Sequence, residues 1–427
     1  MSKKPSVFKR IITNLFTGFI RDKGKRRSVR HYLLSETEEL RHPQLNPIQE
    51  KVEDPSITVQ FVPLSEKSFV RQEGDCKLIA FYLPQFHAID LNDRNFGKGF
   101  TEWTNVVRAT PQFVGHHQPQ IPFDVGFYDL SHDDVMFRQI ELAKQYGLYG
   151  FCFHYYWFSG KRLLEKPIFN YLNNKSLDFP FCLCWANENW STLWDGGNRK
   201  VIMKQELRQE DFDGFWNDIK DFFADRRYIK INNSPLLIVY RPALFEKHLF
   251  TEFVNTLREL AKKSGYNDLF ILRTNFQEEG PCREWACDGT VQFPPHGLGQ
   301  HIPPMSKPSF IKENSMVRFD MSSFLADSGM AAKGLSDDVY RGAFPAWDNT
   351  ARKCHSGGWI FSGITPDGFA KWLEECIRWT KEHHDKDHQL VFINAWNEWG
   401  EGAHLEPDVK YGYAHLEAVK KALEESR

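Results

Sequence analysis

Apolar and polar residues follow two alternating patterns from residue 75 to the end of the chain. Short apolar runs predict buried strands at residues 78–87, 149–157, 180–187, 235–242, 268–275, 289–295, 344–350 and 390–399. Longer segments with apolar residues at helical spacing predict helices at residues 133–146, 211–225, 245–264, 366–384 and 414–424. Strands that alternate with helices in this way predict an α/β fold, a (β/α)8 or TIM barrel, over residues 75–427. An open doubly wound sheet is the alternative, but the chain has no GxGxxG or GxxxxGKS/T motif to support a nucleotide-binding version.

The first 74 residues differ from this pattern. Residues 1–30 contain ten Lys and Arg against one acidic residue, Asp22. Apolar residues recur among them at helical spacing, at Phe8, Ile11, Ile12, Leu15, Phe16, Phe19 and Ile20. Such a basic amphipathic segment is predicted to lie on an anionic membrane. A helix docked on its own domain and a basic tail are the alternatives. Residues 31–74, which contain four prolines, are predicted to be a linker.

Composition excludes several classes of protein. A net charge of −2 over 427 residues gives no general attraction to nucleic acid, and no apolar run is long enough to span a membrane. The eight Cys form no CxxC pair, and the chain begins without a secretory signal. We therefore expect reduced thiols and a cytoplasmic protein, with peripheral contact to the inner membrane through residues 1–30. No His, Cys or acidic residues have the spacing of metal ligands, so the sequence predicts no metal and no other cofactor.

The end of the last predicted strand carries the strongest chemical signal. Glu398 and Glu401 follow the apolar run of residues 390–393 and flank Trp399 and Gly400. Alternation along a continuous strand would put Phe392, Asn394, Trp396 and Glu398 on one face. Paired carboxylates beside indole rings suit glycosidic-bond chemistry, in which one group donates a proton and the other accepts one. The plainer interpretation is that both are solvated loop acids.

Other polar and aromatic residues follow the predicted strands at the end where barrel enzymes carry their chemistry. Amide and carboxyl groups bind sugar hydroxyls, and Trp rings cover the apolar face of a sugar. These residues are the candidate substrate-binding positions: Tyr82, His87, Glu102, Trp103, His154, Tyr155, Trp185, Asn187, Glu188, Trp190, Asp348, Trp396 and Asn397. Each residue alone has an ordinary structural explanation, and only their convergence favours a site.

Five motifs resemble those of WbsX-type proteins, which are glycoside hydrolase family ninety-nine-like domains of bacterial lipopolysaccharide and surface-polysaccharide clusters. They read AFYLPQFH at 80–87, GFTEWTN at 99–105, GHHQP at 115–119, CWANENW at 184–190 and WNEWGEGAHLEP at 396–407. The resemblance covers roughly residues 75–427 and implies a (β/α)8 barrel. In the related endo-mannosidases the last motif reads N-E-W-H-E-G, and both Glu residues are catalytic.

The resemblance implies a retaining mechanism. Glu398 would be the base that assists attack by the sugar's own 2-hydroxyl group, and Glu401 would be the acid and then the base toward water. Gly400 replaces the His of the mannosidase motif, which puts mannosidase specificity in doubt but leaves the carboxylate pair intact.

We therefore expect a carbohydrate-active enzyme that acts on glycosidic bonds in surface-polysaccharide assembly, with an oligosaccharide or lipid-linked glycan as its substrate. A glycosyltransferase or transglycosylase is the second interpretation, and a non-catalytic glycan-binding protein is the third.

Overall fold

The computed structural model describes residues 61–192, 200–275, 280–298, 302, 304–305, 316–326, 335–353 and 357–427. The chain divides into two units, Met1–Lys51 and Val52–Arg427, and every described residue belongs to the second. The predicted membrane-binding segment of residues 1–30 therefore lies outside the described residues. In the part of the chain that is described, no helix has both the length and the apolar character needed to cross a membrane.

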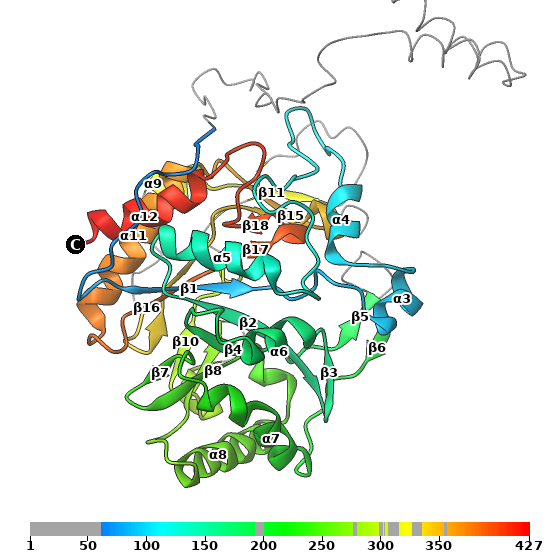
Figure 1. The fold of residues 1–427 in the computed structure, drawn as a ribbon, viewed down its shortest axis with the longest axis vertical. Coiled ribbons are helices and arrows are strands. Elements are labelled where there is room, and N and C mark those ends of the chain that lie inside the picture. Colours follow the sequence, from blue (N-terminus) through cyan, green and yellow to red (C-terminus); the bar gives the residue numbers. More distant parts are fainter. Residues whose placement is uncertain are drawn as a thin grey trace, which may run out of the picture. The chain divides into compact units, whose positions relative to one another are not determined.

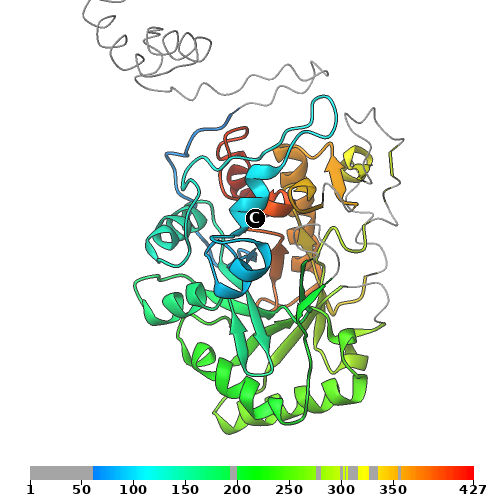
Figure 2. The same cartoon turned by 90° about the vertical axis from the view of Figure 1, so that its right-hand side faces the viewer.

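The described unit is built on a barrel of parallel strands (Figures 1 and 2). From one neighbour to the next, the strands are β12 (Val339–Tyr340), β10 (Gly289–Val291), β9 (Phe270–Thr274), β8 (Ser234–Val239), β4 (Phe181–Trp185), β2 (Gly150–Phe158), β1 (Lys77–Tyr82), β16 (Leu390–Ile393) and β13 (Gly342–Ala343). Because only Arg341 separates β12 from β13, these two short strands form one segment that pairs with β10 on one side and β16 on the other. The predicted (β/α)8 barrel is confirmed.

The seventh strand lies elsewhere than the sequence predicts. Residues 339–343 take this place, whereas the expected run of residues 344–350 contains β14 (Trp347–Asp348), which pairs with β15 (Trp359–Ser362). The true strand is short and polar at Arg341, so it has no apolar signature. Gly342 also leaves no room for a side chain, since a Cβ atom there would lie 1.9 Å from the Gln292 carbonyl oxygen.

Five predicted helices are confirmed to within a few residues: α5 (Asp134–Gln145), α7 (Asp211–Ala224), α8 (Lys247–Lys263), α11 (Pro366–His383) and α12 (Ala414–Glu425). Their apolar faces pack on the barrel, as amphipathic helices require. The sequence analysis missed α6 (Lys166–Asn173), a short helix between β2 and β4.

Smaller elements extend the barrel at its ends. The short helices are α3 (Asp90–Phe96), α4 (Glu102–Arg108), α9 (Ser322–Ala326), α10 (Thr350–Lys353), η3 (Pro242–Leu244), η4 (Cys282–Trp285) and η6 (Trp399–Glu401). The short strands are β3 (Lys161–Leu163), β5 (Trp190–Ser191), β6 (Val201–Met203), β7 (Lys230–Ile231), β11 (Val317–Asp320), β17 (Asn397–Glu398) and β18 (Ala403–His404). Figures 1 and 2 show α4 beside β17 where the chain leaves the barrel strands.

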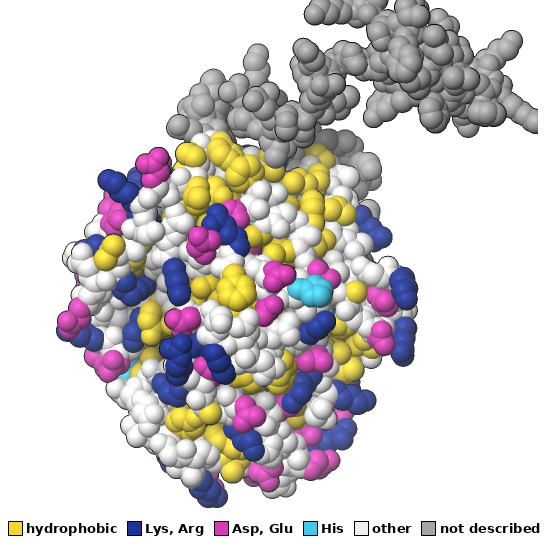
Figure 3. Space-filling view, in the orientation of Figure 1, with side chains coloured by type: hydrophobic (Ala, Val, Ile, Leu, Met, Phe, Trp, Pro, Cys, Tyr) yellow, Lys and Arg dark blue, Asp and Glu magenta, His cyan; other side chains and the backbone are white. Residues whose placement is uncertain are grey.

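Residues 61–74, expected in the linker, pack against the barrel unit. Phe69 is buried and its N–H donates to the Gln145 carbonyl over 2.7 Å. Arg71 donates to the Gly147 carbonyl over 2.7 Å. Over the face shown in Figure 3, cationic and anionic side chains are interspersed, which agrees with the small net charge.

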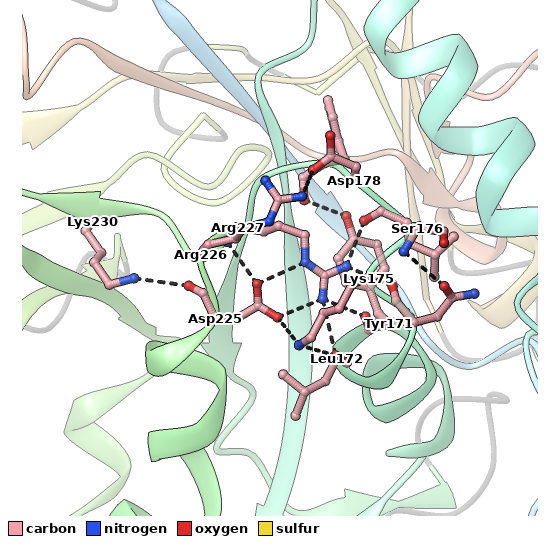
Figure 4. Close-up of polar contacts among 12 residues, drawn as sticks. Tyr171, Leu172, Lys175, Ser176, Asp178, Asp225, Arg226, Arg227 and Lys230 are labelled. Atoms are coloured by element: carbon pink, nitrogen blue, oxygen red, sulfur yellow. Dashed lines mark hydrogen bonds and ion pairs between the residues drawn. The ribbon is translucent and has the colours of Figure 1, made fainter.

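A buried arginine joins α6, α7 and β4 (Figure 4). Arg227 forms two hydrogen bonds to the Asp225 carboxylate, of 3.0 and 2.7 Å, and both side chains are almost fully buried. It also donates to the carbonyls of Tyr171, Asn174 and Leu177, at the end of α6 and just beyond it. The Tyr171 carbonyl lies in the last turn of the helix, where carbonyls lack an intrahelical partner, so Arg227 supplies its hydrogen bond; Asn174 and Leu177 also accept from the N–H groups of Leu177 and Phe179. Burial alone would raise the pKa of Asp225, but the hydrogen bonds from Arg227 and Lys175 outweigh it and lower that pKa.

Candidate active site

Glu398 and Glu401 border a cavity of about 330 Å³ at the carboxyl ends of the barrel strands. This volume lies in the range of small-ligand sites, roughly 300–1,000 Å³. Aromatic side chains supply much of its wall: Tyr156, Trp190, Tyr240, Phe293, Trp347 and Trp359. The cavity is therefore concave and rich in aromatic faces, as a sugar site requires.

Four charged side chains meet beside this cavity. One guanidinium, that of Arg352, contacts three carboxylates: Nε lies 2.6 Å from Glu102, Nη2 lies 2.5 Å from Glu398, and Nη1 lies 3.1 Å from Glu401. Arg352 and Glu102 are buried, whereas 19% of the Glu401 side chain is exposed. Because Glu398 and Glu401 contact neighbouring nitrogens of one guanidinium, they lie no farther apart than the ~9.5 Å that glycosidase pairs span.

The charge balance of this cluster favours a bound proton. With all three carboxyl groups ionised, Arg352 would leave an excess of negative charge in a buried place. Burial raises the pKa of Glu398 to about 8, against the attraction of Arg352 and with help from the charges of Glu401 and Glu102. Burial likewise raises the pKa of Glu401, again against Arg352. The two carboxyl groups therefore titrate as a pair that holds a proton near neutral pH.

Another buried carboxylate, that of Glu406, fixes the turn that carries the pair. Glu406 accepts hydrogen bonds from the indole N–H groups of Trp396 (3.1 Å) and Trp399 (2.7 Å). Gln139 and Tyr128 donate to it as well, over 2.6 and 2.9 Å. Both indole rings are thus held below the cavity floor, away from the substrate space that the sequence analysis assigned to Trp396.

Asparagine side chains hold the ends of two strands. Asn397 accepts from the Leu83 N–H over 2.7 Å and donates to the Leu83 carbonyl over 3.0 Å. Asn187 does the same with Arg241, over 2.7 Å in both directions. Both amides form hydrogen bonds with backbone groups at the point where the hydrogen bonding between neighbouring barrel strands ends. These residues, predicted to bind sugar, therefore position the loops of the site.

Asp348, also expected to bind substrate, holds the start of α10 in place. Its carboxylate contacts His116 and Gln118, each over 2.6 Å, and accepts from the Thr350 N–H over 3.0 Å. Because α10 carries Arg352, Asp348 sets the position of the guanidinium one helical turn away.

Three other predicted residues do line the cavity. His154 faces it from β2, and its Nδ1 makes no hydrogen bond within the described residues. Burial, followed by the charge of Arg352, lowers the pKa of His154 to about 4, so the ring is neutral. Glu188 lies 3.0 Å from Arg241, and Trp190 donates to Asn92 over 3.0 Å.

The remaining candidates point away from the cavity, and alternation along the strands explains three of them. Tyr82, Tyr155 and Trp185 follow inward-facing neighbours, so each side chain packs against a surrounding element. Tyr82 donates to Gln139 over 2.6 Å, Tyr155 donates to Asp218, and Trp185 donates to the Trp157 carbonyl over 3.1 Å.

His87, in the loop after β1, and Trp103, in α4, each make a hydrogen bond to the backbone. The ring of His87 contacts the Pro84 carbonyl over 3.0 Å, and Trp103 donates to the Tyr128 carbonyl over 2.8 Å. Glu102 lies beneath the cavity as the buried partner of Arg352.

A family model described as glycosyltransferase WbsX matches residues 78–419. The chain belongs to the WbsX glycosyltransferase family. Two curated relatives called WxcX, from two strains of Xanthomonas campestris pv. campestris, are 40% identical over 355 residues. The match covers 81% of this chain and 49% of each relative, so the chain spans about half the length of the curated relatives it matches.

Solved structures show that this WbsX chain shares its fold with glycoside hydrolase-type proteins. The GH99 endo-alpha-mannosidase from Bacteroides thetaiotaomicron has a TM-score of 0.51 and 13% identity, covering 82% of this chain and 97% of that one. A glycoside hydrolase-like protein has a TM-score of 0.52 and 14% identity, covering 85% and 98%. The family model is thus described as one of glycosyltransferases, and the fold is shared with glycoside hydrolase-type proteins.

Several cavity residues of this WbsX chain were missed by the sequence analysis. The most important is Arg352, which lies 250 residues after Glu102 and has no motif that couples the two. Arg241, His296 and Asn394 were missed as well. Their only sequence signal is position, since Arg241 and Asn394 lie within predicted strands and His296 directly follows one.

The raised carboxyl pKa values predict how stability depends on pH. Glu398 and Glu406 have folded pKa values of about 8 and about 7, above the ordinary value for Glu. At pH values between the ordinary Glu pKa and these raised pKa values, the folded chain binds more protons than the unfolded chain. The free energy of unfolding therefore falls as pH rises through this range. Buried His154 and His296, with pKa values of about 4, contribute a pH dependence only at about pH 6.5 and below.

We therefore expect the melting temperature to fall between about pH 6.5 and 8, and Glu398→Gln to reduce this slope. Thermal unfolding at constant ionic strength measures both. A melting temperature that rises over this range would contradict the assigned protonation.

Proposed function

We propose that this WbsX protein cleaves or transfers glycosidic bonds in the barrel cavity, with Glu398 as base and Glu401 as acid. The observation that carries the proposal is the placement of both carboxyl groups on one guanidinium at the wall of an aromatic cavity. Their raised pKa values support one shared proton near neutral pH, and the reactive form is the one in which that proton lies on Glu401 while Glu398 is ionised beside Arg352. One acid and one base is the protonation state that glycosidic chemistry needs.

The difference in exposure supports the two roles. Glu401 is the more exposed carboxyl group, at 19% against 7% for Glu398, so it can exchange its proton with water. In the first step, Glu398 takes the proton of the sugar 2-hydroxyl as that oxygen attacks the anomeric carbon. The bond to the leaving oxygen breaks, and Glu401 protonates that oxygen.

In the second step, both proton transfers run in the opposite direction. Glu401 takes a proton from water or from an acceptor hydroxyl, whose oxygen attacks the anomeric carbon as the bond from that carbon to the 2-oxygen breaks. Glu398 returns its proton to the 2-oxygen. Two inversions give overall retention, and the protein ends in its starting protonation state.

Other cavity residues fit the recognition of a sugar. Trp190 and Tyr156 present aromatic surface, with ring centroids 5.2 Å apart in an edge-on arrangement. The neutral His154 ring also forms part of the cavity wall. Asn394 lines the same wall, where its amide nitrogen donates to the Pro294 carbonyl over 2.9 Å.

Transfer to an acceptor is the second candidate, because the family model is described as a glycosyltransferase. The charges of the site disfavour a nucleoside diphosphate donor. Among the described residues, Glu102, Glu188, Glu398 and Glu401 form ion pairs with the guanidinium groups of Arg241 and Arg352, and Lys353 adds a further positive charge near Glu401. A diphosphate would add negative charge to this buried excess. A glycoside donor avoids that repulsion and would give transglycosylation where water is kept out.

Product analysis in ¹⁸O-labelled water tests the proposal. We would incubate the purified protein with neutral bacterial oligosaccharides, lipid-linked glycans and nucleotide sugars, and read the products by mass spectrometry. Hydrolysis places ¹⁸O at the new reducing end, whereas transfer gives a longer unlabelled glycan. Turnover of nucleotide sugars alone would overturn the Glu398 and Glu401 mechanism.

We further propose that the protein works beside a membrane during surface-polysaccharide assembly, through its basic amphipathic segment at residues 1–30. Buried apolar area and about 1 kcal/mol per basic residue near an anionic surface would give reversible binding. Deletion of residues 1–30 is expected to abolish co-sedimentation with anionic vesicles, and high salt is expected to weaken it for the full chain. Equal pelleting of both proteins would contradict this role.

A further inference from the structure

We propose that Arg352, held from behind by Glu102, is a positioning residue that orients Glu398 and Glu401 and sets the pH range in which they work. This inference rests on the proposed function of the pair. It adds a second pair of residues, Arg352 at the cavity wall and Glu102 beneath it, that would act through the two carboxyl groups.

The geometry of the guanidinium carries the argument. Each of its three nitrogens lies near a different carboxylate: Nε donates a hydrogen bond to Glu102 over 2.6 Å, and Nη2 and Nη1 form ion pairs with Glu398 and Glu401 at 2.5 and 3.1 Å. The planar group has five N–H donors in a rigid fork. An anchor on the Nε edge therefore fixes where the other two nitrogens point. A Lys ammonium has one nitrogen and cannot hold three carboxylates in these directions.

The turn between the two glutamates is built around this anchor. A Cβ atom at Gly400 would lie 1.8 Å from Glu102 Oε1 and 2.8 Å from Arg352 Nε. Any side chain at position 400 would therefore push the Glu102 carboxylate off Arg352. Glycine is required here because a carboxylate from α4 passes directly beneath the backbone.

Two other elements hold the anchor and the guanidinium in place. Glu102 begins α4, and its N–H donates to the Gln85 carbonyl over 3.1 Å. Arg352 lies on α10, which Asp348 ties to His116 and Gln118. Both side chains are buried, with 1% and 2% of their surfaces exposed. Burial and these contacts hold both side chains in one place.

Several charged and titratable groups face the carboxyl pair. Arg352 and Lys353 from α10 favour its ionised form, whereas Glu102 from α4 opposes ionisation. Tyr156 from β2 and Tyr240 after β8 face the pair as well, and burial raises the pKa of both phenols, so they stay neutral. Glu102 and Arg352 thus act on the pair with opposite signs.

This opposition gives a sharp test. Glu102→Gln removes a negative charge, which makes the pair easier to ionise and moves both limbs of the kcat/KM profile to lower pH. Arg352→Met removes a positive charge and moves both limbs to higher pH. We expect shifts of about 1 pH unit in each direction. Arg352→Lys keeps the charge, so its profile moves less, while kcat falls at every pH because the fork is lost.

Controls separate this role from general damage to the fold. Arg378→Met removes an arginine that pairs with Glu374 and Glu375 on the surface of α11, and it is expected to leave the profile unchanged. Gly400→Ala is expected to shift the profile in the same direction as Glu102→Gln, because it displaces the same carboxylate. Loss of activity without any shift, or shifts of the same sign for Glu102→Gln and Arg352→Met, would overturn the proposal.

A readout without turnover distinguishes failure of this proposal from failure of the proposed function. The infrared band of protonated carboxyl groups, assigned by difference with Glu398→Gln and Glu401→Gln, follows the pair directly during a pH titration. Glu102→Gln alone must move its midpoint downward. If Arg352→Met does not fold, the titration of Glu102→Gln still tests the inference. An unchanged titration midpoint in Glu102→Gln overturns the inference even if the enzyme acts on sugars.

Discussion

Replacing Glu401 by Gln lowers turnover by roughly 10²–10⁴-fold, because the amide cannot donate a proton to the leaving oxygen. Glu398→Gln is expected to produce a loss of similar size, because the base for the 2-hydroxyl is removed. Both changes keep the size of the side chain and one acceptor oxygen for Arg352. The fold should therefore remain intact, and substrate binding should change much less than kcat.

Initial rates on the cleaved glycan, together with circular dichroism of each variant, measure these effects. Glu141→Gln is the matched control, since this glutamate lies on the exposed side of α5 in a pair with Arg138. It is expected to retain full activity. Wild-type turnover by Glu401→Gln would end the acid assignment, and wild-type turnover by both variants would remove the carboxyl pair from the mechanism.

Arg227→Met is expected to destabilise the protein by about 3–5 kcal/mol, because it leaves the buried Asp225 carboxylate without its guanidinium. The same change removes the donors to the carbonyls at the end of α6 and just beyond it. Equilibrium unfolding in urea at neutral pH measures the loss. The site lies at the opposite end of β4, so folded Arg227→Met protein should keep its catalytic rate.

The neighbouring residue provides a control in the same segment. Arg226 pairs with Asp178 at 2.9 Å, but both side chains are more than half exposed. Arg226→Met is expected to cost less than about 1 kcal/mol, as surface ion pairs do. In the double variant Asp225→Asn with Arg227→Met, the loss should be smaller than the sum of the two single losses. Equal effects at positions 226 and 227 would contradict the role of burial.

The barrel was readable from the sequence because seven of its strands are apolar runs, and its larger helices have one apolar face. Residues 390–393 and α11 illustrate this, since the buried residues of each can be identified from the apolar positions in its own sequence. The seventh strand was not readable. Residues 339–343 pair by backbone hydrogen bonds around a buried Arg341, and Gly342 is there for close approach rather than for apolar burial.

The candidate site divides in the same way. Sequence motifs located Glu398 and Glu401 because both lie in one short turn after a strand. They also indicated Trp185, Trp396 and Asn187, whose residue types suit a sugar. The side chains of these three residues instead donate hydrogen bonds to other groups of the protein. Alternation by one residue decides whether a strand side chain faces the cavity or a helix, and strand ends are where that register is hardest to extend.

By itself, the sequence determined the barrel, the carboxyl pair and the end of the barrel at which the pair lies, because each follows from neighbours along the chain. Only the tertiary structure decided the partners of that pair. Arg352 and Glu102 are 250 residues apart and meet beneath Gly400 because α4 and α10 fold over the same turn. Ion pairing of this kind depends on distance in space and on burial, and neither is encoded by spacing along the chain.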